Sequence, residues 1–263
     1  MITVKEIMRS CQTPSEEVER LMQFVHEAFF DDAGTDAGSE FTVCAGYLSN
    51  HRQWRSFEIK WGRLLRSYHV RPEKFSMKDL AALDGEFKQW KEHQRRSFLN
   101  AALPLIRDRV EVGFISVVRK RVYQAYVSKE VRQHIGNDFC YCAQFVIAMM
   151  ECYLQCRNAS HRLVWITFEK GTKGLGKLQD ACEEQFEHFS MNREFSRADK
   201  RCLPLHAADV IAYESRKLYA SLERVRYPIK QLVHNIPHWI MGLDGCELAQ
   251  LDSVLKQAGI GVQ

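Results

Sequence analysis

The sequence of 263 residues lacks the features that mark membrane, secreted or disordered chains. No apolar run approaches the roughly 18–20 residues of a membrane span, and the first twenty residues are mixed and charged, unlike a signal peptide. There is also no internal repeat and no low-complexity linker. With 46% hydrophobic and 27% charged residues, the chain can bury a core. We therefore expect a cytoplasmic single-domain protein with no membrane partner.

Cysteine pairing and a strong net charge are also missing. Nine cysteines are present, an odd number without a regular framework. The C-x-C pair Cys140/Cys142 and the pair Cys152/Cys156 do not match the C-x-x-C spacing of structural zinc sites. We expect reduced, buried thiols. The net charge of +4 is compatible with an anionic partner but too small to indicate one alone.

Hydrophobic periodicity and capping residues predict an alternating α/β order. Thr13, Pro14 and Glu16 predict a short helix to about Met22, followed by a strand that ends at Asp31. Further strands are expected at 41–48, 110–118, 161–168 and 194–197, and helices at 51–71, 86–108 (with a possible bend at Pro104), 138–156, 178–189, 205–222 and 246–256.

This order predicts an α/β fold with a ribonuclease H-like mixed sheet flanked by helices. A helical insertion at about 51–108 follows the second strand. Without it, two hairpin strands and a third strand precede alternating helices and parallel strands, which is the ribonuclease H-like connectivity. The domain is expected to span 1–225, with 226–263 as a helical extension packed on it.

Carboxylates follow three elements that this connectivity brings together. Asp31 ends the first strand, Glu169 ends the fourth, and Asp209 lies near the start of the last long helix. Three carboxylates can hold one or two Mg²⁺ or Mn²⁺ ions, and a pair of ions roughly 4 Å apart supports phosphodiester hydrolysis. Taken singly, Asp31 or Asp32 is more typical of a turn or cap residue and Glu169 of a solvated loop, whereas Asp209 is either a partner of the helix N-terminus or a site acid.

Asp31 and Asp32 are neighbours in a predicted strand, so their side chains are expected to point to opposite faces of the sheet. We expect Asp31 to face the metal, while Asp32 serves as an auxiliary ligand or points to the other face of the sheet.

Three short motifs resemble domain of unknown function family 3800. They are FFDDAG at 29–34, FSMKDL at 75–80 and LHAADVIAY at 205–213. The resemblance covers about 25–225 and implies a ribonuclease H-like fold and a metal-dependent nuclease. It assigns motif acids to Asp31, Asp32 and Asp209, and the fourth-strand acid to Glu169.

The chain departs from that family at three positions. Ala33 stands where the family tends to have Ser, Ser76 where it tends to have His, and His206 where it tends to have Gln. His206 lies three residues before Asp209, on the same face of the predicted helix. It could orient a water or donate a proton, or it could replace an amide hydrogen bond.

Basic residues supply candidate contacts to a nucleic-acid backbone. Four arginines share the face of the 51–71 helix opposite its aromatic residues, and this stripe is either a solvated face or a phosphate contact. Further basic residues follow the third and the fourth predicted strands. The candidates are Arg52, Arg55, Arg63, Arg66, Arg119, Lys120, Arg121, Lys170, Lys173 and Lys177.

The sequence therefore predicts a divalent-metal-dependent nuclease acting on DNA or RNA, with Asp31, Glu169 and Asp209 as ligands and homo-oligomerisation left open. Two alternatives stand beside it. One is a non-catalytic interaction module of the same fold. The other is a nucleotide binder using GTKGLGKL at 171–178, which fits a P-loop except that Leu178 replaces the Ser or Thr that would hold Mg²⁺. Ala33 argues against an Asp-nucleophile phosphatase.

Overall fold

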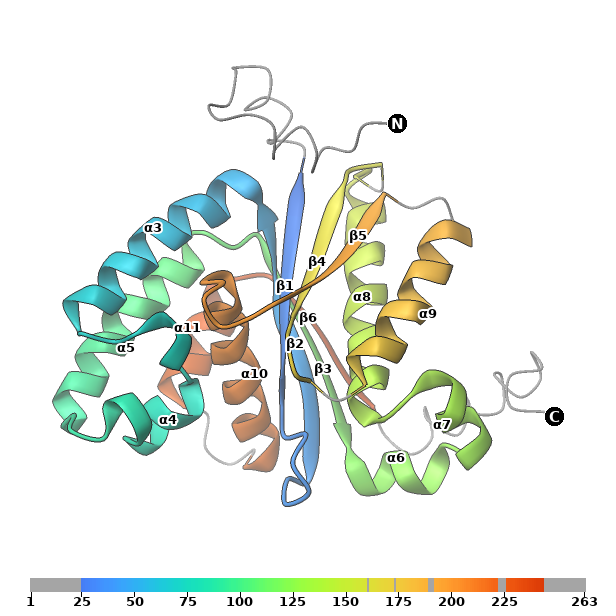
Figure 1. Ribbon diagram of the computed structural model, residues 1–263, viewed down its shortest axis with the longest axis horizontal. Coiled ribbons are helices and arrows are strands. Elements are labelled where there is room, and N and C mark those ends of the chain that lie inside the picture. The colour runs from blue at the N-terminus through green and yellow to red at the C-terminus, as the bar shows by residue number, and fades with distance from the viewer. Residues whose placement is uncertain (1–24, 160, 173, 189–191, 222–225, 244–263) are drawn as a thin grey trace.

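A six-stranded mixed sheet forms the middle layer of the protein, and helices cover both of its faces (Figure 1). The computed structural model describes residues 25–159, 161–172, 174–188, 192–221 and 226–243. The strands are β1 (His26–Ala33), β2 (Phe41–Asn50), β3 (Val112–Arg119), β4 (Val164–Glu169), β5 (Arg193–Ala198) and β6 (His238–Leu243). The longer helices are α3 (His51–Ser67), α5 (Glu92–Arg107), α8 (Asp138–Cys156), α9 (Leu175–His188) and α10 (Pro204–Ala220), and the shorter ones are α4 (Met77–Ala82), α6 (Lys120–Tyr126), α7 (Lys129–Ile135) and α11 (Tyr227–Asn235).

The strand order confirms the predicted ribonuclease H-like topology. The sheet runs β5-β4-β1-β2-β3-β6. β2 is antiparallel to both β1 and β3, whereas β4 pairs parallel with β1 and β5 pairs parallel with β4. The insertion between β2 and β3 consists of α3, α4 and α5, as expected. The fold places β1 beside β4 in the sheet, which decides where their acids meet.

Each face of the sheet has its own hydrophobic core. In Figure 1, α3, α4, α5, α10 and α11 lie on one face and α6, α7, α8 and α9 on the other. Consecutive residues of β1 alternate between the two: Phe29 packs in the first core and Phe30 in the second. Asp31 and Asp32, which follow them, are therefore directed to opposite faces.

The expectation that no apolar stretch approaches a membrane span is corrected by α8, which has the length and composition of one; most of that stretch is buried inside the protein, as in a core helix. Asn137 caps it by accepting a hydrogen bond from the Cys140 N–H at 2.9 Å. Its buried side chains then cover β2 and β3. The prediction that this apolar helix is buried is confirmed.

The C-terminal part of the described chain differs from the predicted helical extension. It forms α11 and then β6, which adds a sixth strand parallel to β3. The apolar run after Pro237 is short, so its pairing is decided by the open edge of β3 rather than by a strong local signal. The helices expected at 13–22 and 246–256 lie outside the described residues.

Two further differences concern the helices around β3. The helix expected from Glu86 begins only at Glu92, and it continues through Pro104 to Arg107. The basic stretch after β3, for which no helix was predicted, forms α6 and α7. Ser128 caps α7 by accepting from the Val131 N–H at 3.4 Å.

The cysteines were predicted to be buried thiols, and this is correct only for some of them. Those that the structure describes are free. Cys44, Cys140, Cys142 and Cys182 are buried, but the pair on the last turns of α8, Cys152 and Cys156, is exposed.

Gly34 ends β1 in a conformation that favours glycine. Its φ is +79°, and a Cβ there would lie 2.0 Å from the Phe41 carbonyl oxygen. We expect Gly34→Ala to lower the free energy of unfolding by more than about 2 kcal/mol, because it adds left-handed strain to a backbone clash. Gly38→Ala, in the same loop, is the control, because its Cβ would meet Asp36 only at 3.4 Å. Equal midpoints for the two variants in urea unfolding would show that Gly34 is not required.

Candidate active site

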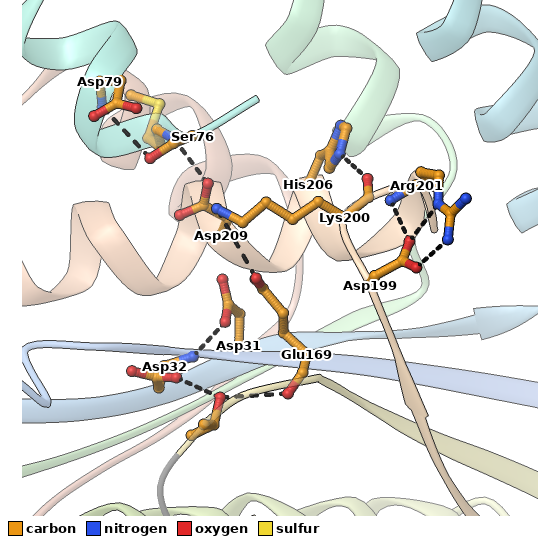
Figure 2. Close-up of polar contacts among 12 residues, drawn as sticks. Asp31, Asp32, Ser76, Asp79, Glu169, Asp199, Lys200, Arg201, His206 and Asp209 are labelled. Atoms are coloured by element: carbon orange, nitrogen blue, oxygen red, sulfur yellow. Dashed lines mark hydrogen bonds and ion pairs between the residues drawn. The ribbon is translucent and has the colours of Figure 1, made fainter. Parts of the chain in front are cut away.

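Three carboxyl groups from three elements face one another at one end of the sheet. Phe30 lies opposite Phe168 in the parallel β1/β4 pair, so the next residues, Asp31 and Glu169, follow side by side. Helix α10 packs across the same face and contributes Asp209 from its second turn. Figure 2 shows the three side chains pointing toward a common space. The structure thus brings together the three acids predicted as metal ligands.

This space is an open cavity of about 570 Å³. Acids and bases line it together, and the basic residues come from four different segments. Sequence reasoning selected Lys170 but missed the other three. The charged and polar lining includes Asp31, Asp32, Glu169, Asp209, Lys78, Lys170, Lys200, Arg216, Thr172 and Tyr213.

Burial and mutual repulsion make the carboxyl groups hard to ionise. Asp31 is 7% exposed, and its pKa is raised well above the usual range by burial first and then by the charges of Asp209, Glu169 and Asp32. Burial also raises the pKa of Asp209, to about 6. The pKa of Glu169 is raised by burial even though Lys200 opposes the shift. A cation bound among them would relieve this repulsion.

Each inward-facing aspartate is fixed by a backbone N–H. Asp31 Oδ1 accepts from the Asp32 N–H at 2.8 Å, and Asp209 Oδ2 accepts from the Met77 N–H at 2.7 Å. Met77 is the first residue of α4, whose N-cap is Ser76. The Asp209 contact thus ties the FSMKDL segment, which includes Ser76, to the cavity.

Asp32 has a different role from its neighbour. Its carboxylate accepts from Thr35 Oγ1 at 2.6 Å and from Thr172 Oγ1 at 2.8 Å, one bond on each oxygen. These bonds join the turn after β1 to the loop after β4. Asp32 therefore holds the rim of the cavity, which it also lines. Its position agrees with the alternative in which it points to the other face from Asp31, and an auxiliary role at the metal stays a prediction.

Of the two roles predicted for His206, a catalytic one and the replacement of an amide hydrogen bond, its surroundings favour the second. His206 is 2% exposed and stacks on Phe75 at 4.7 Å. Its Nδ1 accepts from Trp61 Nε1–H at 2.9 Å, so Nε2 carries the proton and donates to the Lys200 carbonyl at 2.7 Å. Burial lowers its pKa to about 4. Both ring nitrogens are thus engaged away from the acids, as in the amide-replacement alternative.

Lys200 was not selected from the sequence. Its Nζ lies 3.9 Å from Glu169 Oε1, and its charge also opposes the raised pKa of Asp209. Figure 2 shows its side chain extending between Glu169 and Asp209. A usable signal was its place in the basic loop that leads directly into α10, the helix that carries Asp209.

The carboxylate oxygens in the cavity are chemically suited to a hard divalent cation. They are not arranged as a complete set of ligands for one. Among the described residues, no group of three or more His, Cys, Asp or Glu side chains is arranged to hold a metal ion. The oxygen donors Asp31, Glu169 and Asp209 are nevertheless of the kind that Mg²⁺ and Mn²⁺ prefer. Burial raises the pKa of all three carboxyl groups, and the charges of neighbouring acids add to this shift.

The predicted nucleic-acid contacts fall into separate places. The four α3 arginines are exposed, and Arg52 lines a cavity with Asn50 beside the N-terminal end of β1, away from the acids. Lys120 and Lys177 line a cavity of about 450 Å³ together with Arg132. Gly174 also lines that cavity, two residues after Thr172 of the acid-lined one. Arg119 pairs with Glu40, Arg121 is exposed, and the placement of Lys173 lies outside the described residues.

The geometry around 171–178 does not favour a phosphate cradle. The Leu175 N–H donates to the Thr172 carbonyl and the Leu178 N–H to Gly174. Thr172 in turn donates its hydroxyl to Asp32, an acid that would repel a polyphosphate. Leu178 is fully buried, where a metal-binding hydroxyl would be needed. The loop is therefore part of the rim of the acid cavity.

Comparisons with known proteins give no family and a solved structure of low similarity. No protein-family model and no curated protein matches the sequence. Among solved structures, a chain in the structure of the PCNA:RNase HII complex from Archaeoglobus fulgidus is similar, with 13% sequence identity, 89% of each chain covered and a TM-score of 0.33. The fold assignment rests on the order and direction of the strands of this chain.

Proposed function

We propose that the protein is a divalent-metal-dependent nuclease that hydrolyses phosphodiester bonds of DNA or RNA. Asp31, Glu169 and Asp209 would hold Mg²⁺ or Mn²⁺. The observation that carries the proposal is the convergence of these carboxyl groups from β1, β4 and α10 in one cavity of a ribonuclease H-like sheet. We also propose, from the three short motifs, that the chain is related to domain of unknown function family 3800.

The residues around the acids fit phosphodiester chemistry. A bound divalent ion supplies stabilisation of developing negative charge and a more acidic water. Asp31 and Asp209 keep their carboxyl groups in place through backbone N–H donors. Asp32 and Thr172 hold the loop that presents Lys170 to the cavity. Lys78 and Arg216, also in the lining, provide positive charge for the phosphates that flank the scissile bond.

A non-catalytic interaction module is the second candidate. The observation that favours it is the pairing of Glu169 with Lys200, which places a resident cation at one of the three acids. Such a module would bind its partner without a metal ion.

Cleavage assays on purified protein separate the two candidates. The substrates are end-labelled single- and double-stranded DNA and RNA, each incubated with Mg²⁺, Mn²⁺, Ca²⁺ or EDTA. The proposal predicts cleavage with Mg²⁺ or Mn²⁺ that EDTA abolishes. Binding of any substrate without cleavage under all four conditions would favour the module.

The cavity lined by Lys120, Arg132 and Lys177 is the proposed path of the nucleic-acid backbone beyond the acids. We expect Lys120→Glu and Lys177→Glu each to weaken binding uniformly across sequences and to reduce the slope of log K against log salt by about 1. The matched control is Arg52→Glu, which makes the same charge change near the other end of β1. Fluorescence anisotropy at several salt concentrations measures both. A larger effect for Arg52→Glu would instead assign the contact to α3.

A further inference from the structure

The ammonium group of Lys200 occupies the position in which the acid cavity needs positive charge. It lies 3.9 Å from Glu169 Oε1, and Figure 2 shows its side chain extending between Glu169 and Asp209. We infer that Lys200 is a built-in cation that neutralises the cavity while no divalent ion is bound, and that a divalent ion must displace it. The metal-binding part of this inference rests on the proposed function.

The carbonyl group of Lys200 is fixed by a hydrogen bond on the side away from the acids, while its side chain extends toward them. His206 Nε2 donates to the Lys200 carbonyl at 2.7 Å, and Trp61 fixes the ring from its other nitrogen at 2.9 Å. On either side of Lys200, Asp199 and Arg201 pair with each other at 2.6 Å. Asp199 and Arg201 thus neutralise each other and do not pair with Lys200. Figure 2 shows the Lys200 ammonium group directed to the cavity.

The contact itself is loose enough to be exchanged. The Lys200 side chain is 34% exposed, that of Glu169 is 21% exposed, and 3.9 Å exceeds the length of a charge-assisted hydrogen bond. A partly exposed pair of this kind contributes little to stability. The four flexible methylene groups of lysine allow the ammonium to leave for solvent while the backbone stays fixed.

The other bases of the lining do not replace Lys200. Lys78, Lys170 and Arg216 line the same cavity. Within the described part of the chain, however, Lys200 is the base of this lining that forms an ion pair with one of the three acids, Glu169. This selectivity makes Lys200 the competitor of a divalent ion, whereas the other bases remain available to a bound phosphate.

Binding of Mn²⁺ by Lys200→Met tests the inference directly. Methionine keeps most of the length and removes the charge, so we expect it to bind Mn²⁺ roughly tenfold more tightly than the unchanged protein, a gain of about 1.4 kcal/mol. Lys200→Arg, which keeps the charge, should stay near the unchanged protein. Lys60→Met, on the exposed face of α3, is the control for removal of any positive charge. The free Mn²⁺ signal in electron paramagnetic resonance, at about pH 8, gives the affinity without an activity assay.

The outcomes separate this inference from the proposed nuclease. Equal or weaker binding by Lys200→Met than by the unchanged protein would overturn the inference and leave the nuclease proposal standing. Binding by Lys200→Met alone would support the inference but contradict metal-dependent catalysis by the unchanged protein. Absence of binding by both would overturn both.

Discussion

Asp31→Asn and Asp209→Asn are each expected to lower metal-dependent cleavage by roughly three orders of magnitude. Each substitution removes a charged ligand and with it several kcal/mol of stabilisation of the transition state. The asparagine oxygen can still accept from the backbone N–H groups of Asp32 and Met77, so the local structure should survive. Initial rates on labelled DNA and RNA, at several Mn²⁺ concentrations, measure the loss.

The control is Asp180→Asn, which makes the same chemical change on the exposed side of α9. It should cleave like the unchanged protein. If highly purified Asp31→Asn and Asp209→Asn still cleave both DNA and RNA with Mn²⁺, the carboxylates are not the active site.

The same substitution in Asp209 is expected to stabilise the metal-free protein at neutral and higher pH. Burial raises the pKa of Asp209 from 3.8 to about 6. At a pH between these two pKa values, Asp209 is protonated in the folded state and ionised in the unfolded state. Stability is therefore greatest below about pH 4 and falls as pH rises through about 6. Asp209→Asn removes that loss, and we expect its free energy of unfolding to be about 2 kcal/mol higher at pH 8.

Urea unfolding between about pH 5 and pH 8, in the presence of EDTA, measures this difference. The two proteins should be closest at the acidic end and diverge as pH rises. Adding Mn²⁺ should stabilise the unchanged protein and have little effect on Asp209→Asn, since metal and proton compete for the same oxygens. A variant that is less stable than the unchanged protein at every pH would show that the ionised carboxylate stabilises the fold.

The topology and the three acids could be predicted because they depend on chain order. The order of strands and helices predicted that β1 and β4 are neighbours in the sheet. The carboxylates at the ends of these two strands were therefore expected to lie close together. The opposite directions of Asp31 and Asp32 followed from the two-residue period of a strand. Local patterns of this kind do not require knowledge of distant side chains.

The features that were missed depend on contacts between distant segments. Trp61 and His206 are 145 residues apart, and their hydrogen bond decides which nitrogen of the imidazole is protonated. This contact, rather than the position of His206 before Asp209, determines what the histidine does. The side chain of Lys200 reaches Glu169, at the end of β4, from the β5–α10 connection. The pairing of β6 likewise required the exposed edge of β3.

The most direct test of the account is Mn²⁺ bound in a crystal. A crystal of the protein soaked in Mn²⁺ and measured at a wavelength with manganese anomalous signal locates the ion without reference to activity. The account predicts an anomalous peak in the cavity with carboxylate oxygens of Asp31 and Asp209 as ligands, and the Lys200 ammonium moved away from Glu169. A fully soaked crystal with Lys200 still between Glu169 and Asp209 and no peak beside Asp31 would contradict it.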